Sequence, residues 1–190
     1  MKKIVFGLFG TALLVGLYSF APKKSTKDIV TLNVLAEKSR VDWVGSKKSD
    51  FHTGYFTVKS GTVQVEAGKL KGGEFVIDLA NVKVTDAGGG AKLEGHLKTA
   101  DFFDVAKYSE ATYKISSVTY TNDNTATVAG NLNLKGASLP VSFQVAIRNS
   151  DDKGFFGEAF FSLDRTAFGV NYGIGNVAKD VQLAIHLFAK

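Results

Sequence analysis

The chain of 190 residues contains no cysteine. Disulfide bonds, thiol catalysis and lipid attachment through a lipobox cysteine are therefore excluded. The sequence also lacks a Gly-x-Ser-x-Gly elbow, a His-Glu-x-x-His pair and a phosphate-binding loop. Its histidines, His52, His96 and His186, show no metal-ligand spacing. We therefore expect no catalytic residue, no metal site, no cofactor and no enzymatic activity.

Strong charge and proline are also scarce. Lys2 and Lys3 supply two of the net charge of +5, and the other lysines form no dense patch, so a nucleic-acid partner is not expected. Two prolines beside 20 glycines and 15 phenylalanines suit a sheet with many tight turns. The apolar fraction of 45% indicates a globular chain that can bury a substantial core.

The amino terminus has the form of an export segment. Lys2 and Lys3 precede an uncharged, mostly apolar run at residues 4–21. Ser19-Phe20-Ala21 has the small-x-small form of a cleavage site, although Pro22 follows it directly; the run is also close to the ~20 residues that span a bilayer. Residues 1–21 are thus predicted to be a signal peptide or a retained membrane anchor, and residues 22–29 a linker. Either alternative predicts a periplasmic or otherwise exported domain at 30–190.

After residue 29, apolar and polar residues alternate with the period of β-strands. Separators rich in Asn, Asp and Gly are typical of turns between antiparallel neighbours. Strands of ~11 residues rise about 36 Å and favour a tall, tilted barrel over a small sandwich. We predict an all-β fold, a closed antiparallel up-and-down β-barrel of about eight strands. The predicted strands are 31–34, 39–45, 52–58 and 62–66 with a bend at Gly61, 70–84, 111–121, 125–135, 139–148, 155–163 and 180–189.

Hydrophobicity marks one face of most predicted strands as the inward face. A barrel of ~8 strands is just wide enough to be filled by such side chains or to hold one slender ligand, and the sequence leaves both alternatives open. The predicted inward residues are Val41 and Trp43; Phe75, Ile77 and Leu79; Tyr113 and Ile115; Val128, Leu132 and Leu134; Val141, Phe143, Val145 and Ile147; Phe161 and Leu163; and Val181, Leu183, Ile185 and Leu187.

Residues 92–104 are the exception to strand patterning, because their apolar residues fall three or four apart. We predict one short helix there, near a barrel opening. Leu97, Phe102 and Phe103 would form its apolar underside, and Gly88-Gly-Gly90 would be a hinge.

Arg165 is the polar residue of most interest, because it follows a long apolar strand and should lie at a barrel rim. It could be a solvated partner of Asp164. Alternatively, its guanidinium could bind the carbonyl or phosphate head group of a ligand whose tail lies inside, with His52 or Lys135 as further candidates.

Several segments together resemble the YceI-like family of secreted lipid-binding proteins. The resemblance covers about residues 31–190, and the segment around the predicted helix is its most specific part. The segments are Val41-Asp-Trp-Val-Gly45, His52-Thr-Gly-Tyr-Phe56, Gly72-Gly-Glu-Phe-Val-Ile-Asp78, Leu93-Glu-Gly-His-Leu-Lys-Thr-Ala-Asp-Phe-Phe-Asp-Val105, Lys107-Tyr108, Ala111-Thr-Tyr113, Gly130-Asn-Leu-Asn-Leu-Lys-Gly136, Pro140-Val141 and Arg165-Thr-Ala-Phe-Gly169.

The resemblance implies an extended lipocalin-like barrel that carries or stores polyisoprenoids, isoprenoid quinones or fatty-acid-like amphiphiles without a metal. Departures from the family pattern fall mainly on polar positions: Ser109 where the family usually has proline, Lys135 in place of histidine, and Asp164 and Ala167 around Arg165. The resemblance therefore supports the predicted fold more strongly than any specificity for a ligand head group. The predicted ligand-binding residues are Trp43, Phe56, Phe75, Ile77, Leu97, Phe102, Phe103, Tyr113, Leu132, Phe143, Phe161, Arg165 and Phe168.

The sequence thus favours a non-catalytic carrier of one long-chain lipid, with a possible membrane tether at residues 4–21. It does not determine the oligomeric state, and a dimer is one possibility. Two alternatives remain. A barrel-based enzyme would need a titratable pair facing the cavity. A protein-interaction module would have a filled interior and an exposed apolar patch.

Overall fold

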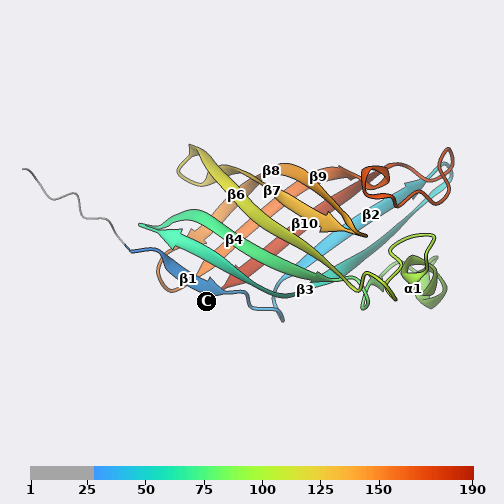
Figure 1. Ribbon diagram of the computed structural model, residues 1–190, viewed down its shortest axis with the longest axis horizontal. Helices are drawn as coiled ribbons and strands as arrows, with labels where there is room; N and C mark the ends of the chain where they lie inside the picture. Colours follow the sequence, from blue (N-terminus) through green and yellow to red (C-terminus); the bar gives the residue numbers. More distant parts are fainter. Residues whose placement is uncertain (1–27) are drawn as a thin grey trace, which may run out of the picture.

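The computed structural model describes residues 28–190, so the predicted export segment lies outside the described residues. Figure 1 shows an elongated barrel with β1 at one end and α1 at the other. The elements are β1 (Val30–Asn33), β2 (Arg40–Lys47), β3 (Asp50–Glu66), β4 (Lys69–Asp78), β5 (Lys83–Val84), α1 (Gly90–Lys98), β6 (Glu110–Asn122), β7 (Thr125–Leu134), β8 (Ala137–Ser150), β9 (Phe155–Asp164), the 3-10 helix η1 (Arg165–Phe168) and β10 (Asp180–Ala189).

The predicted antiparallel β-barrel is confirmed. Eight strands form a closed ring in the order β2-β3-β4-β6-β7-β8-β9-β10, and β10 pairs again with β2. Short β1 and β5 add to the two edges of β3 that β2 and β4 leave uncovered. Ser39 extends the seam between β2 and β10, because its buried hydroxyl accepts from the Phe188 amide and donates to the Phe188 carbonyl.

Two tight turns fix the register of neighbouring strands. Ala67 and Gly68, between β3 and β4, both have positive φ, and so do Lys135 and Gly136, between β7 and β8. Positive φ at both central residues is the geometry of a two-residue hairpin whose twist matches that of the strands.

The two segments predicted on either side of a bend at Gly61 form one continuous strand, β3. Two register shifts against β4, between Val58 and Ser60 and between Gln64 and Val65, interrupt the pairing on either side of Gly61. Glycine is required here for close approach: a Cβ on Gly61 would lie 2.5 Å from the Glu74 carbonyl, and one on Gly73 would lie 2.4 Å from the Thr62 carbonyl.

The predicted strand at 70–84 is wrong in its second half. β4 ends at Asp78, whose carboxylate accepts from the backbone and side-chain nitrogens of Asn81. Such Asx turns compete with a strand ladder for the backbone. The chain resumes strand pairing only at β5.

The predicted helix is also too long, because α1 ends at Lys98. The Thr99 amide and hydroxyl both bond to the His96 carbonyl, and Asp104 adopts a left-handed φ of 51°. Phe102 and Phe103 therefore lie in the turn after α1 instead of on it. Residues three or four apart can thus gather on one side of an irregular segment as well as on a helix.

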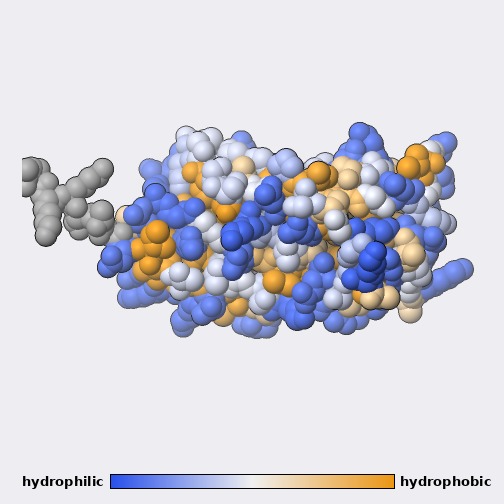
Figure 2. Space-filling model, in the orientation of Figure 1, coloured by the Kyte–Doolittle hydropathy of each residue, from blue (hydrophilic) through white to orange (hydrophobic). Residues whose placement is uncertain are grey.

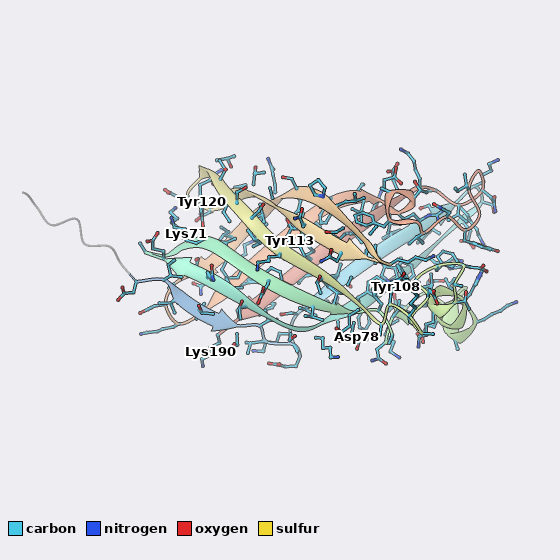
Figure 3. The ribbon with its side chains drawn as sticks, viewed as in Figure 1. Lys71, Asp78, Tyr108, Tyr113, Tyr120 and Lys190 are labelled. Atoms are coloured by element: carbon cyan, nitrogen blue, oxygen red, sulfur yellow. The ribbon has the colours of Figure 1, made fainter. Side chains whose placement is uncertain are left out.

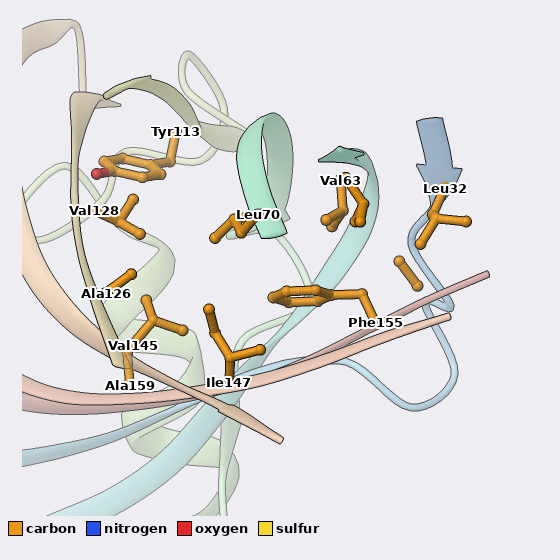
Figure 4. Close-up of a cluster of buried hydrophobic side chains, with 12 residues drawn as sticks. Leu32, Val63, Leu70, Tyr113, Ala126, Val128, Val145, Ile147, Phe155 and Ala159 are labelled. Atoms are coloured by element: carbon orange, nitrogen blue, oxygen red, sulfur yellow. The ribbon is translucent and has the colours of Figure 1, made fainter. Parts of the chain in front are cut away.

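Two groups of buried side chains occupy the two ends of the barrel. The floor cluster, at the β1 end, includes Leu32, Val63, Leu70, Ala126 and Phe155 (Figure 4). The mouth cluster, at the α1 end, includes Trp43, Leu79, Leu97 and Phe102. Outside, the face in Figure 2 mixes hydrophilic and hydrophobic side chains. Within residues 28–190, no helix is long and apolar enough to cross a membrane.

We expect Gly73→Ala to lower the free energy of unfolding by about 1–3 kcal/mol, because the new methyl group meets backbone that cannot yield. Gly95→Ala is the matched control: a Cβ there has open space, and alanine in a helix is favoured by about 0.5–1 kcal/mol. Urea denaturation of both variants checks this, and equal destabilisation would contradict the close approach of β3 and β4.

Candidate functional site

A cavity of about 240 Å³ lies inside the barrel. All eight ring strands contribute to its lining, which is almost entirely aliphatic and aromatic. Every residue predicted to face inward lines it except Ile147, which is packed in the floor cluster. The alternation of hydrophobic residues therefore identified the inner face correctly.

The accessibility of the inward side chains shows that the barrel is not fully packed. Phe143, Phe161 and Leu183 line the cavity, yet they are only partly buried. Residues of the floor cluster that do not face the cavity, such as Val63, have no exposed surface. Side chains that point into the barrel and keep accessible area border empty space, so the interior is hollow between the floor cluster and the mouth cluster.

An aromatic layer formed by Phe75, Tyr113, Phe143 and Phe161 narrows the middle of the cavity. Phe143 and Phe161 stack with ring centroids 4.4 Å apart, and Tyr113 lies 5.4 Å from Phe143. Phe75 is the cross-strand partner of Tyr113, which Figure 3 shows midway along the barrel. The Tyr113 hydroxyl donates to the Val141 carbonyl, and burial raises the pKa of this phenol to about 12. The layer is therefore uncharged at neutral pH.

At the α1 end, aromatic side chains from separate segments surround the cavity. The Phe56 ring lies between those of Trp43 and Phe103. Its centroid is 6.5 Å from the Trp43 centroid and 5.5 Å from the Phe103 centroid, and Phe56 and Phe103 meet edge-on. The Trp43 ring lies over Gly54, where a Cβ would come within 2.4 Å of it. The buried Trp43 indole N–H has no hydrogen-bond partner among the described residues.

A second aromatic group joins α1 to the loop between η1 and β10. The ring centroid of Tyr172 in this loop lies 4.6 Å from that of His96 and 5.0 Å from that of Phe102. No sequence pattern indicates this contact, because the segment around Tyr172 is typical of a glycine-rich separator between strands. Val170, Val177 and Ala178 of the same loop also line the cavity and were missed for the same reason.

Arg165 is not a solvated partner of Asp164, although it lines the cavity. It is only 5% exposed, and its guanidinium donates to the carbonyls of Val170, Tyr172, Val177 and Ala178. Burial lowers the pKa of Arg165, as expected for a desolvated cation. The side chain thus folds the loop at the mouth around itself. Asp164 instead accepts from the Thr166 amide and lies 3.5 Å from Lys179.

The other polar candidates are also engaged within the chain. Lys135 donates to the carbonyls of Ala100 and Gly169 and so ties a hairpin turn to the mouth. His52 contacts Asp86, whose carboxylate also accepts from the Thr53, Gly88 and Gly89 amides. The predicted glycine hinge is therefore held by hydrogen bonds to Asp86.

Among the predicted ligand-binding residues, only Phe168 does not line the cavity. Its side chain is buried in the mouth cluster behind the lining, because η1 turns it toward the protein. Metal ligation has no support in the part of the chain that the structure describes, where no three His, Asp or Glu side chains gather in a suitable group.

A closed antiparallel barrel around an apolar cavity defines the lipocalin-like class of folds. Within this class, the chain belongs to the YceI-like family, because the YceI-like domain matches residues 32–189.

The relatives agree with this assignment over nearly their whole length. A UPF0312 protein of Pseudomonas putida (strain F1) is 28% identical, and the match covers 97% of this chain and 95% of the relative. Burkholderia cenocepacia BcnA is 25% identical with a TM-score of 0.73, covering 83% of this chain and 99% of BcnA. A polyisoprenoid binding domain from Saccharophagus degradans has a TM-score of 0.66 at 17% identity, covering 86% of this chain and 99% of that domain. This last similarity concerns the fold.

We expect Arg165→Leu to lower the free energy of unfolding by about 2–4 kcal/mol, because it leaves buried carbonyls without a donor. Arg148→Leu is the control, since this exposed arginine pairs with Glu158 at the surface and should contribute less than about 1 kcal/mol. Urea titration measures both, and similar losses would show that the carbonyl contacts do not hold the loop.

Asp86 makes the loop before α1 sensitive to acid. Hydrogen bonds from His52 and from the Thr53 amide lower the pKa of Asp86 to about 2. Because an unperturbed aspartate titrates near pH 4, the loop contact is fully stabilising above that pH and is lost as the pH falls through about 2. Amide NMR signals of Gly88 and Gly89 should follow this titration. Their change between pH 6 and 4 would contradict it, and Asp86→Asn should abolish it.

Proposed function

We propose that this protein is a non-catalytic carrier or store for a long-chain amphiphile, whose apolar tail occupies the barrel interior. The observation that carries the proposal is the hollow interior, lined by apolar side chains that keep accessible surface inside the barrel. Burial of ~400 Å² of tail surface at ~25 cal/mol per Å² would contribute about 10 kcal/mol before ordering costs. Such binding requires no directed chemistry.

Polyisoprenoids, isoprenoid quinones and fatty-acid-like lipids are the ligand classes of this proposal. The polyisoprenoid binding domain from Saccharophagus degradans shares the fold and so supports a lipid ligand. The contacts within the chain favour binding over catalysis, because Arg165 is bonded to carbonyls and Tyr113 is neutral. Glu158 and Arg165, the charged residues of the cavity lining, are engaged within the chain: Glu158 pairs with Arg148 and His186, and Arg165 donates to loop carbonyls.

The protein-interaction alternative meets only one of its two requirements. The outer face of β9 and β10 carries Phe160, which is 66% exposed, and a stacked pair formed by Phe156 and Phe188. The interior is hollow, however, whereas that alternative predicts a filled barrel. A carrier accounts for the interior, so it is the function we propose.

The proposed place of action is the periplasm or another exported compartment. Support comes from the sequence, in which Lys2 and Lys3 precede the uncharged run at residues 4–21. Retention of that run would tether the barrel to a membrane, whereas its cleavage would release it. Amino-terminal sequencing of the protein from its host separates the two.

Organic extraction of the protein purified from its native host, followed by mass spectrometry, tests the function directly. We expect one long-chain lipid in stoichiometric amount. Repeatedly empty protein that also fails to bind added lipid would overturn the proposal.

Trp43, the only tryptophan of the chain, lines the cavity and reports on its occupancy. We expect Val141→Phe to weaken lipid binding at least tenfold in a Trp43 fluorescence titration, because the larger side chain fills the cavity. Ser142→Phe is the matched control, since Ser142 is the next residue of β8 and is exposed. Equal affinities of the two variants would place the ligand outside the barrel.

A further inference from the structure

One end of the cavity is closed by packed side chains. Leu70, Val128, Val145 and Phe155 of the floor cluster line the cavity where it ends. Behind them, Val63 and Ala126 are 0% exposed. Figure 4 shows Phe155 reaching across this end of the barrel toward Leu70. A ligand tail that enters from the α1 end therefore meets a solid floor.

The strand β9 gives the depth of the cavity, because its alternate residues from Phe155 to Leu163 all line it. Eight residue steps rise about 26 Å along the strand, or about 20 Å along the axis of a barrel tilted by ~40°. With C–C bonds of ~1.5 Å at tetrahedral angles, an extended alkyl chain advances about 1.25 Å per carbon. The depth thus accommodates about 16 carbons.

The width of the cavity admits a single chain. The stacked Phe143 and Phe161 rings and the adjoining Tyr113 ring narrow its middle. This narrowing favours one chain over two chains side by side.

We propose that the ligand is an amphiphile with one apolar chain of up to about 16 carbons, and that Phe155 sets this limit. This inference rests on the proposed carrier function and specifies the tail. The floor is a property of this chain's packing: Phe155 also contacts Gly157, where a Cβ would come within 2.8 Å of the Phe155 ring. Glycine at position 157 therefore leaves the space that the Phe155 ring occupies.

Straight-chain fatty alcohols of 8 to 24 carbons, supplied as cyclodextrin complexes, test the limit through Trp43 fluorescence of the full chain. Each added methylene that enters the cavity should raise affinity about fourfold, the change that ~0.8 kcal/mol of burial produces. The rise should stop near 16 carbons. Farnesol should bind, whereas the long polyprenol solanesol should not.

Phe155→Leu should move the limit upward by two or three carbons, because it removes about that much of the floor. Phe156→Leu is the matched control, since the next side chain along β9 points outward and stacks on Phe188 at 4.1 Å. If Phe155→Leu fails to fold, Leu187→Phe provides the opposite test. Leu187 lines the cavity opposite Gly157, so the larger ring should lower the limit.

The outcomes separate this inference from the function on which it rests. Absence of binding at every chain length would overturn the carrier itself. Affinity that keeps rising to 24 carbons, tight binding of solanesol, or equal limits in the Phe155 and Phe156 variants would overturn the chain-length limit and leave the carrier intact.

Discussion

The pairing of β10 with β2 closes the sheet, and the other features of the molecule depend on this closure. It joins residues about 140 positions apart in the chain and places Leu183 beside Trp43 and Ile185 beside Val41. Once the ring is closed, the inner face of every strand shares one enclosed volume with no free edge. Eight strands make that volume too wide for the side chains present to fill it completely. The cavity is therefore a consequence of strand number together with side-chain size.

The two ends of the barrel are closed by different kinds of interaction. At the β1 end, tightly packed apolar side chains such as Val63 and Phe155 form a floor. At the α1 end, polar contacts organise irregular chain: Arg165 collects carbonyls of one loop, Lys135 ties a hairpin to it, and Asp86 holds the segment before α1. Hydrogen-bonded loops can open at lower cost than a packed core. This asymmetry supports entry of the proposed ligand at the α1 end.

Arg165 has contacts that its local sequence does not predict. The sequence correctly placed a cation where a long apolar strand ends. Its partners, however, are carbonyls of residues 5 to 13 positions further along a loop without periodicity. The same reason explains why Tyr172 was missed and why Phe102 and Phe103 were assigned to a helix that ends before them. Local patterns carry no information on such contacts, which only the folded loop creates.

The sequence by itself determined most of the strands, their inward faces and hence the barrel, because a residue period of two and turn residues such as Gly136 act locally. It also determined that the inner surface is apolar and that the chain resembles the YceI-like family. Only the tertiary structure decided that the interior is hollow, where its floor lies, and that the polar residues at the mouth bind the chain itself. Cavity volume and hydrogen-bond partners depend on how distant segments meet, and a linear pattern does not contain that information.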